Sequence, residues 1–230
     1  MKKQPKNNSM IVRWDDLLQY EPMTVNQEKA FKSWDNGDHL VMMGSAGTGK
    51  TFVAMYLGLE TILDKDEAQD KLVIIRSMVP TRDIGYLPGS KAEKEDAFLA
   101  PYKAIATELF ADKGSYGKMV SNKQLEFHST SHIRGITIDD AVIIVDEMQN
   151  LNFHELDSVI TRVGRNCRVI FSGDYLQTDF KYDDDKSGIY EFMRIIERLN
   201  DFNIVHFGWE DIVRSDFVRD YIMTKEMLNG

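Results

Sequence analysis

Apolar residues along the chain fall into short, often β-branched runs that are separated by longer stretches with apolar positions at helical spacing. Such runs are typical of strands buried in a parallel sheet, and the stretches between them are typical of amphipathic helices. The expected strands are residues 39–43, 71–76, 125–130, 141–145, 168–171 and 203–207. The expected helices are residues 25–36, 50–63, 91–110, 153–164, 186–199 and 216–228. In the third of these, Pro101 is expected to begin the second half of the helical region. Because strands alternate with helices, we predict an α/β fold with a mainly parallel sheet and helices on both faces.

The length of 230 residues suits one domain with a short extension. We expect residues 1–21 to form a polar N-terminal arm and residues 22–230 to form a single domain. Thr24 is the expected N-cap of the first helix, and Gln27, three residues later, completes a capping box.

Charge and cysteine content exclude several classes of protein. Lys and Arg number 28 and Asp and Glu 37, so the formal net charge is −9, which excludes a general polycation that coats nucleic acid but not a local basic groove. The single cysteine, Cys167, excludes an intramolecular disulfide and a zinc cluster built on thiolates. No apolar run approaches the ~18 residues that span a bilayer, and no apolar signal-peptide segment follows the first lysines. We therefore expect a cytoplasmic protein with no membrane partner.

A glycine-rich segment carries the strongest chemical signal. Residues 44–51 read GSAGTGKT and satisfy G-x-x-x-x-G-K-[ST] between an expected strand and an expected helix. Glycines let backbone N–H groups curl around a phosphate, and a helix N-terminus adds partial positive charge. Lys50 is expected to reach the β- and γ-phosphates of ATP, and the Thr51 hydroxyl is expected to ligate Mg²⁺. The expected ATP-binding residues of this loop are Gly44, Ser45, Ala46, Gly47, Thr48, Gly49, Lys50 and Thr51.

A pair of acids, Asp146 and Glu147, follows the apolar run 142–145. An apolar strand that delivers an acid at its carboxyl end is the Walker B arrangement. We expect Asp146 to hold Mg²⁺ through water and Glu147 to orient and deprotonate the attacking water as a general base. The alternative is that both acids are the solvated end of a strand, which the glycine-rich segment upstream makes a weaker interpretation.

The loop 172–177, SGDYLQ, follows the next expected strand. In an open parallel sheet, ligands bind at the carboxyl ends of the strands, so this loop is expected within reach of the γ-phosphate. Gln177 carries an amide that can contact a phosphate oxygen and a water molecule, which makes it a candidate catalytic residue. The alternative is an ordinary surface turn.

These motifs support a resemblance to a known family. With GSAGTGKT, the segments GYLPGSKAEK, IRGITIDDAVIIVDEMQN, SGDYLQTD, SGIY and DIVRSDFVRDYI resemble the PhoH-like ATPase family, which is related to the RecA-like core of superfamily 1 helicases. The resemblance covers about residues 22–225 and implies a single RecA-like P-loop NTPase domain.

The resemblance also implies roles for particular residues. It implies that Gln27 reads N6 and N7 of adenine, that Gln149 and Asn150 couple hydrolysis to a bound strand, and that Arg214 is an arginine finger. For Gln27 the capping role stays open beside this one. For Arg214 the alternative is an ordinary surface ion pair with Asp211 or Asp216.

Other groupings give weaker signals. His128 and His132 are four residues apart, but they fall on a strand end and a loop, so we do not expect a metal pair there. Six arginines could line a basic patch, although charged residues more often form a solvated face. They are Arg76, Arg82, Arg134, Arg162, Arg165 and Arg168.

The motifs together favour an ATPase that binds ATP and Mg²⁺ and couples hydrolysis to RNA or single-stranded nucleic acid, with RNA helicase activity as one form of that coupling. Two alternatives stay open. One is a P-loop small-molecule kinase, and the other is a nucleotide-gated binding module whose turnover is incidental.

The length also bears on assembly. Superfamily 1 helicases use a second core to supply arginines to the γ-phosphate, and this chain has room for one core. We therefore expect a homo-oligomer, for example a ring such as a hexamer, in which Arg214 of one subunit serves the site of its neighbour. The alternative is a monomer in which Arg214 acts within its own chain.

Overall fold

The structure, a computed structural model, describes residues 11–77, 91–133, 135–174 and 183–229. Its centre is a sheet of six parallel strands in the order β3-β2-β4-β5-β1-β6. The strands are β1 (His39–Gly44), β2 (Lys71–Arg76), β3 (Leu125–Ser129), β4 (Ala141–Asp146), β5 (Arg168–Gly173) and β6 (Phe202–Phe207). The predicted parallel α/β architecture is therefore confirmed, with every expected strand present.

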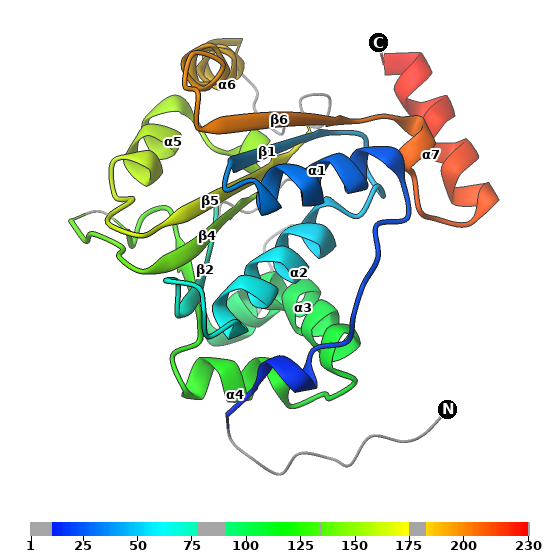
Figure 1. Cartoon of the computed structure of the whole chain (residues 1–230). Helices are drawn as coiled ribbons and strands as arrows, with labels where there is room; N and C mark the ends of the chain where they lie inside the picture. Colours follow the sequence, from blue (N-terminus) through cyan, green and yellow to red (C-terminus); the bar gives the residue numbers. More distant parts are fainter. Residues whose placement is uncertain (1–10, 78–90, 134, 175–182, 230) are drawn as a thin grey trace.

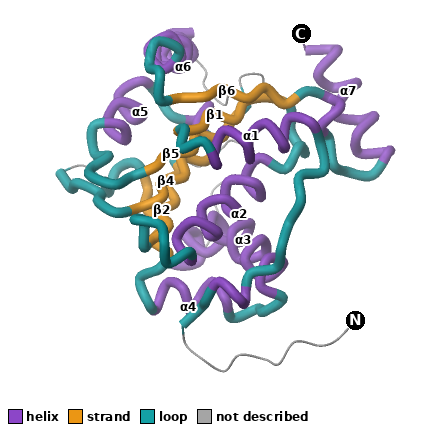
Figure 2. Tube along the Cα trace, in the orientation of Figure 1, coloured by secondary structure: helices purple, strands orange, loops and turns teal. Residues whose placement is uncertain are grey.

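Helices cover both faces of this sheet (Figures 1 and 2). One face carries α1 (Val25–Asp35), α2 (Lys50–Leu63), α3 (Lys91–Phe110) and α4 (Ser115–Ser121). The other face carries α5 (Phe153–Ile160) and α6 (Asp183–Ile196). The last helix, α7 (Asp216–Asn229), lies beyond the carboxyl end of β6, at the right of Figure 1.

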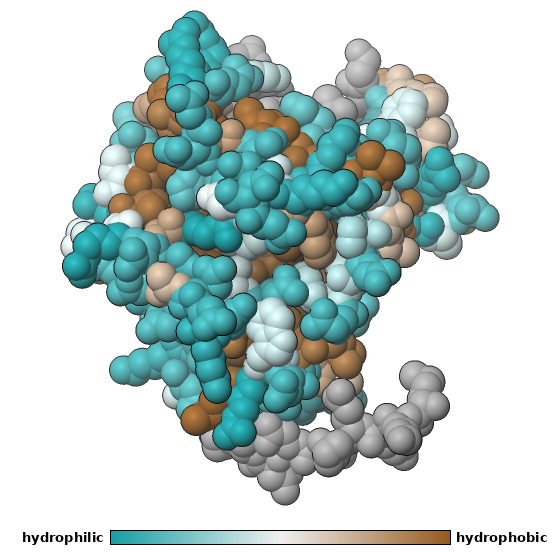
Figure 3. Space-filling view, in the orientation of Figure 1, coloured by the Kyte–Doolittle hydropathy of each residue, from teal (hydrophilic) through white to brown (hydrophobic). Residues whose placement is uncertain are grey.

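Alternate residues of the strands other than β3 enter two separate hydrophobic cores. In β2, Leu72 and Ile74 face the core that contains α1 to α4, whereas Val73 and Ile75 face the core that contains α5 and α6. This follows from the two-residue period of a strand, which sends successive side chains to opposite faces. A strand buried on both faces must be apolar at every position, which explains the continuous apolar runs in the sequence. The outer surface is mainly hydrophilic on the face seen in Figure 3.

The strand register brings the carboxyl ends of the central strands to one edge of the sheet. Arg76 at the end of β2 lies opposite Asp146 at the end of β4. Met43 of β1 lies opposite Gly173 of β5, and Gly44 lies opposite Phe207 of β6. Residues far apart in the chain therefore meet at this edge.

Three local features differ from the expectation. The helix α3 is continuous through Pro101, whereas a second helical segment is expected to begin there. Its buried residues Tyr102, Ala106 and Leu109 all follow the proline. The helix α4 is additional, and at seven residues it is too short to show a helical repeat in the sequence. The helix α5 ends at Ile160, because the backbone after it pairs with Ile138 instead.

The N-terminal segment that the structure describes is attached to the domain. Val12 and Leu17 are buried in the core beside α2 and α3. The Leu18 backbone N–H donates to the Leu109 carbonyl oxygen at 2.8 Å, and the Gln124 side chain donates to the Val12 carbonyl oxygen at 3.0 Å. Val12 and Leu17 thus add to the core, although several residues between and after them are exposed.

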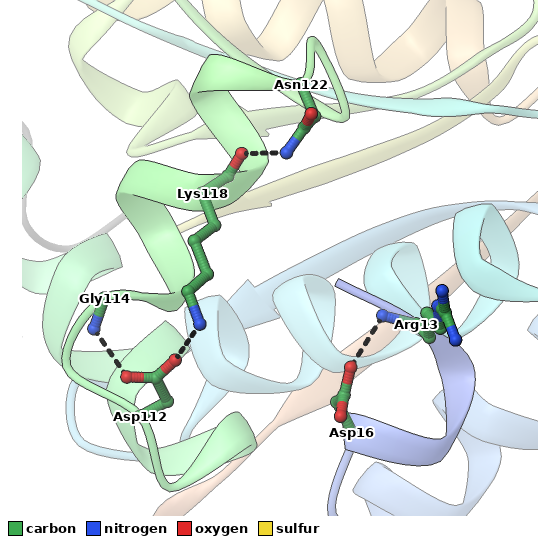
Figure 4. A network of polar contacts seen from close by, with 6 residues as sticks. All are labelled: Arg13, Asp16, Asp112, Gly114, Lys118 and Asn122. Atoms are coloured by element: carbon green, nitrogen blue, oxygen red, sulfur yellow. Dashed lines mark hydrogen bonds and ion pairs between the residues drawn. The ribbon is translucent and has the colours of Figure 1, made fainter. Parts of the chain in front are cut away.

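A network of polar contacts surrounds α4, the helix at the bottom of Figure 1, and is drawn from close by in Figure 4. The Asp112 carboxylate accepts hydrogen bonds from the Gly114 backbone N–H and from Lys118 Nζ, both at 2.9 Å. In the same region, the Arg13 backbone N–H donates to Asp16 Oδ2 at 3.0 Å. These contacts fix the turn between α3 and α4 and the short helical turn after Arg13.

Candidate nucleotide-binding site

A cavity of about 690 Å³ opens at the carboxyl edge of the sheet. It lies between the glycine-rich loop, the ends of β2, β4 and β5, and one side of α3. The residues that line it include Tyr20, Met23, Ala46–Phe52, Arg76, Pro101, Ile105, Glu108, Asp146, Glu147, Gln149, Asp174 and Arg214. This position agrees with the general rule that open parallel sheets bind ligands at their carboxyl ends.

The glycine-rich loop is held closely against β6. A Cβ atom on Gly44 would lie 1.9 Å from the Phe207 carbonyl oxygen, and Gly44 has a φ of +135°. The next residue, Ser45, donates its backbone N–H to that same oxygen at 3.1 Å. Gly44 is therefore required for the strand and loop to approach this closely. Of the eight loop residues predicted to bind nucleotide, Ala46 to Thr51 line the cavity. Gly44 and Ser45 do not line it and instead contact Phe207 of β6.

Lys50 opens α2 and folds its side chain back into the loop. Its Nζ donates to the carbonyl oxygens of Gly44 and Ser45, both at 2.7 Å, and to Thr48 Oγ1 at 3.2 Å. Burial lowers the pKa of Lys50, and nearby carboxylates, Asp174 first among them, oppose that change. The Lys50 ammonium group is thus held by neutral carbonyl oxygens, which phosphate oxygens of a ligand could replace as its hydrogen-bond partners.

Thr51 and Asp146 meet across the cavity floor. The Thr51 hydroxyl donates to Asp146 Oδ1 at 3.0 Å, although the two residues belong to α2 and β4. Asp146 is 3% exposed, and its Oδ2 accepts a second hydrogen bond from the Tyr102 hydroxyl at 2.8 Å. A hydroxyl and a carboxylate beside a phosphate loop match Mg²⁺, which prefers oxygen ligands and is usually held by one or two carboxylates and the phosphates themselves. Within the described ranges, no cluster of three or more His, Cys, Asp or Glu residues could hold a metal.

Glu147 follows Asp146 in a left-handed backbone conformation, with a φ of 54°. Its carboxylate accepts a hydrogen bond from the Gln149 side chain, and Gln149 Oε1 accepts from the Asp174 backbone N–H at 3.0 Å. Burial and the neighbouring Asp146 charge raise the pKa of Glu147, whereas the Arg76 guanidinium lowers it. A carboxyl group of raised pKa in a cavity suits a general base.

Gln149 therefore joins the ends of β4 and β5. A Cβ atom on Gly173 would lie 2.6 Å from Gln149 Oε1, so Gly173 leaves the space that this amide occupies. Asn150 follows in the short helical turn Met148–Asn150. Gln177, the candidate of the next loop, lies outside the residues that the structure describes.

Gln27 is fully buried and does not line the cavity. Its Oε1 accepts hydrogen bonds from the Met23 backbone N–H at 2.8 Å and the Tyr20 hydroxyl at 2.9 Å, and its Nε2 donates to the Thr48 carbonyl oxygen at 3.1 Å. The N-cap role of Thr24 is confirmed, but the Gln27 side chain does not complete a capping box. The amide is thus engaged with protein groups in this structure, and its contact with adenine N6 and N7 stays a prediction.

Arg214 lies at the mouth of its own chain's cavity. Its Cγ would be 3.1 Å from a Cβ placed on Gly47, and the preceding Val213 donates its backbone N–H to the Gly47 carbonyl oxygen at 3.0 Å. Asp211 is buried, where it accepts hydrogen bonds from Asn26 and the Gly208 backbone N–H. Among the described residues, no ion pair joins Arg214 to Asp211 or Asp216.

The structure adds site residues that motifs did not identify. Arg76 lines the cavity beside Asp146, whereas the sequence places it only in a candidate basic patch. Arg76 is the last residue of an expected strand, and the same strand-end argument that applies to Asp146 could have identified it as a site residue. Tyr102 contacts Asp146 from a helix, and Glu226 of α7 accepts a hydrogen bond from Ser45 Oγ at 2.9 Å. Neither of these residues belongs to a local pattern.

The six arginines do not form one patch. Arg76 ends β2 at the carboxyl edge of the sheet, whereas Arg168 begins β5 at the opposite edge, where it stacks 3.4 Å from the Trp34 ring centre. Because the two ends of a parallel strand are separated by its length, Arg76 and Arg168 cannot belong to one patch, which agrees with the favoured interpretation of solvated charges. Arg82 and Arg134 lie outside the described residues.

Within the described part of the chain, no helix combines the length and the apolar character that a membrane span requires.

Comparison with known proteins agrees with this architecture. A family model described as PhoH-like protein matches residues 19–225. A PhoH-like protein of Mycobacterium leprae is 30% identical over 203 residues, which cover 87% of this chain and 57% of that protein. The protein PhoH of Escherichia coli K12 is 33% identical over 174 residues, which cover 75% of this chain and 48% of that protein. The chain thus spans about half the length of these curated relatives.

A solved structure supports the fold. The large terminase from a thermophilic bacteriophage aligns with 87% of this chain and 50% of its own, at a TM-score of 0.50 and 12% sequence identity. At that identity the likeness concerns the fold alone, and the fold is that of a P-loop NTPase. Since the family model covers residues 19–225, most of the sequence, this chain belongs to the PhoH-like family, as its motifs predict.

Proposed function

We propose that this protein binds ATP with Mg²⁺ in the cavity, hydrolyses ATP, and couples the hydrolysis to RNA or another single-stranded nucleic acid. The observation that carries the proposal is the hydrogen bond of 3.0 Å between Thr51 and Asp146, with Glu147 next to it. That arrangement brings the glycine-rich loop, a carboxylate that could hold a metal and a candidate base into one cavity, which supports the proposal.

The loop residues and Lys50 would bind the phosphates. Backbone N–H groups of the loop and the N-terminus of α2 favour anionic oxygens, and Lys50 Nζ would leave the carbonyls of Gly44 and Ser45 to contact the β- and γ-phosphates. Thr51 and Asp146 would hold Mg²⁺, whose chemistry there is to offset negative charge on the phosphate oxygens.

Glu147 would take the proton of the attacking water. Its raised pKa lies closer to neutral pH than that of an ordinary glutamate, which favours proton transfer at physiological pH. The hydrogen bond from Gln149 orients the carboxylate, and Gln149 also contacts the backbone of Asp174. This contact supports a role for Gln149 in linking the protonation of Glu147 to the position of the loop after β5. We propose that this loop in turn responds to a bound nucleic-acid strand. Gln177, in that loop, stays a candidate for contact with the γ-phosphate.

The first experiment is phosphate release from ATP with and without single-stranded RNA or DNA, with Asp146→Asn as the inactive control. We expect Mg²⁺-dependent release that a single strand stimulates. Transfer of phosphate to a small metabolite in place of water would favour a kinase instead. Slow release that no nucleic acid changes would favour a nucleotide-gated binding module. Strand separation of a labelled duplex would establish helicase activity specifically.

Assembly is a separate proposal. We propose a homo-oligomeric ring, such as a hexamer, in which a neighbouring subunit could supply an arginine, but Arg214 borders the glycine-rich loop of its own chain, which supports action within one subunit. Mixing Arg214→Ala with Lys50→Ala chains separates the two roles. Recovered activity would show that Arg214 serves a neighbour, and no recovery would show that it serves its own site. Mass in solution with ATP and Mg²⁺ tests the ring itself.

A further inference from the structure

Tyr102 is a fully buried tyrosine whose hydroxyl reaches the nucleotide site from α3. It donates a hydrogen bond to Asp146 Oδ2 at 2.8 Å, while Asp146 Oδ1 accepts from Thr51 at 3.0 Å. The two carboxylate oxygens are thus held by hydroxyls from two different helices. A carboxylate fixed at both oxygens cannot rotate freely about its side-chain bonds.

The tyrosine ring is itself held in place. It packs against Phe127 of β3 with ring centres 5.8 Å apart, and it belongs to the core that contains α1 to α4. Its neighbours Pro101 and Ile105 line the cavity from the same helix. Tyr102 is therefore a rigid support that connects the cavity wall to the acid at the cavity floor.

We propose that Tyr102 is a positioning residue for Asp146. By holding Oδ2, its hydroxyl keeps Oδ1 directed at Thr51, the side on which Mg²⁺ would be held. Partners that orient a metal-holding carboxylate in this way typically change metal affinity or activity by about 10- to 100-fold when removed. The inference rests on the proposed function, because it assumes that Asp146 holds Mg²⁺.

The test is a binding titration that needs no turnover. The affinity of purified protein for a non-hydrolysable ATP analogue is measured by calorimetry without Mg²⁺ and at increasing Mg²⁺ concentrations. In Tyr102→Phe we expect the affinity without Mg²⁺ to stay the same and the apparent Mg²⁺ affinity to fall about tenfold or more. Tyr102→Phe removes one oxygen and keeps the ring in the core, and its unfolding temperature verifies that the fold persists.

Tyr116→Phe is the matched control. Tyr116 is buried in the same core, on α4, and its hydroxyl has no hydrogen-bond partner among the described residues. Its removal should leave both affinities unchanged. Equal Mg²⁺ titrations for the Tyr102→Phe and Tyr116→Phe proteins would overturn the inference.

A third variant separates this inference from the proposed function. Asp146→Asn should weaken the Mg²⁺ effect by itself, and Tyr102→Phe should add nothing further in that background, because it acts through Asp146. A normal Mg²⁺ response in Asp146→Asn would refute the metal role of Asp146. A full additional loss in the double variant would overturn the inference, because Tyr102 would then act by another route, such as its contact with Arg76, and not through the carboxylate.

Discussion

The Gln27 side chain donates a hydrogen bond of 3.1 Å to the carbonyl oxygen of Thr48 and thereby ties α1 to the phosphate loop. The same amide accepts hydrogen bonds from Tyr20 and Met23, which border the cavity. Gln27 therefore supports the shape of the cavity through residues that line it, although its own side chain does not line the cavity.

Gln27→Ala should weaken binding of ATP and GTP by similar factors. The substitution leaves buried partners without hydrogen bonds, so we also expect a loss of about 1–3 kcal/mol in the free energy of unfolding. Nucleotide titrations and denaturant unfolding measure the two effects. Gln69→Ala is a control, since Gln69 is also buried and donates to a backbone carbonyl, that of Asn166. Selective loss of ATP binding would mean that Gln27 does read adenine.

Lys50→Ala should abolish nucleotide binding or turnover, because the cation that the loop surrounds is removed. Lys118→Ala removes a lysine that pairs with Asp112 at the lower end of the molecule, and it should leave nucleotide affinity unchanged (Figure 4). Equilibrium binding of a fluorescent ATP analogue compares the two. Near-normal hydrolysis by Lys50→Ala would contradict the assignment of the loop.

Glu147→Gln should keep Mg²⁺–ATP binding and lose hydrolysis. The change removes the base and preserves the side-chain shape, and a general base typically contributes about 10²–10⁴-fold in rate. Single-turnover phosphate release with parallel binding measurements checks the prediction. Glu60→Gln offers a comparison, because Glu60 is also partly buried and has a raised pKa. It lies near the C-terminal end of α2, where its carboxylate accepts a hydrogen bond from the Tyr56 hydroxyl. Lost binding in Glu147→Gln would show that Glu147 is structural.

His39 should make the stability of the fold depend on pH. Burial, helped by the Arg168 charge, lowers the pKa of His39 below 6.5, while Asp201 and Asp38 act in the opposite direction. Its Nδ1 accepts a hydrogen bond from the Val169 backbone N–H at 3.1 Å, which requires that nitrogen to be unprotonated. As the pH falls, His39 is therefore protonated in the unfolded chain before it is protonated in the folded chain. The free energy of unfolding decreases as the pH is lowered from neutral past 6.5.

Denaturant unfolding between neutral and mildly acidic pH measures this effect. The His39→Gln protein should show a flatter profile, because the group that titrates is gone. His154→Gln changes an exposed histidine of α5 and should keep the profile of the unmodified protein. Identical profiles in all three proteins would rule out His39 as the source.

The strands and the phosphate loop were predictable because each depends on a local pattern. A strand buried on both faces, such as β4, needs an unbroken apolar run, and the loop needs its glycines and lysine at fixed spacing. The apolar run 142–145 followed by two acids likewise predicted that Asp146 and Glu147 lie at the carboxyl end of a strand.

What the sequence could not reveal depends on contacts between distant segments. Gln27 carries a helix-start pattern, but its amide is engaged by Tyr20 and Thr48, which only the folded chain brings together. Tyr102 occupies an ordinary core position of α3, and nothing local indicates that its hydroxyl meets Asp146. The separation of Arg76 from Arg168 likewise follows from which end of a strand each occupies.

The order of the sheet has a consequence for synthesis on the ribosome. β1, which carries the phosphate loop, is made first among the strands, yet its two neighbours are β5 and β6, which are made last. Until residues 168–173 have emerged, the apolar segment Leu40–Met43 has no strand on either side, and it gains its second neighbour only with residues 202–207. A nascent chain therefore carries β1 as an unpaired, aggregation-prone strand until β5 has been made, and the cavity that the glycine-rich loop borders can form only after that point.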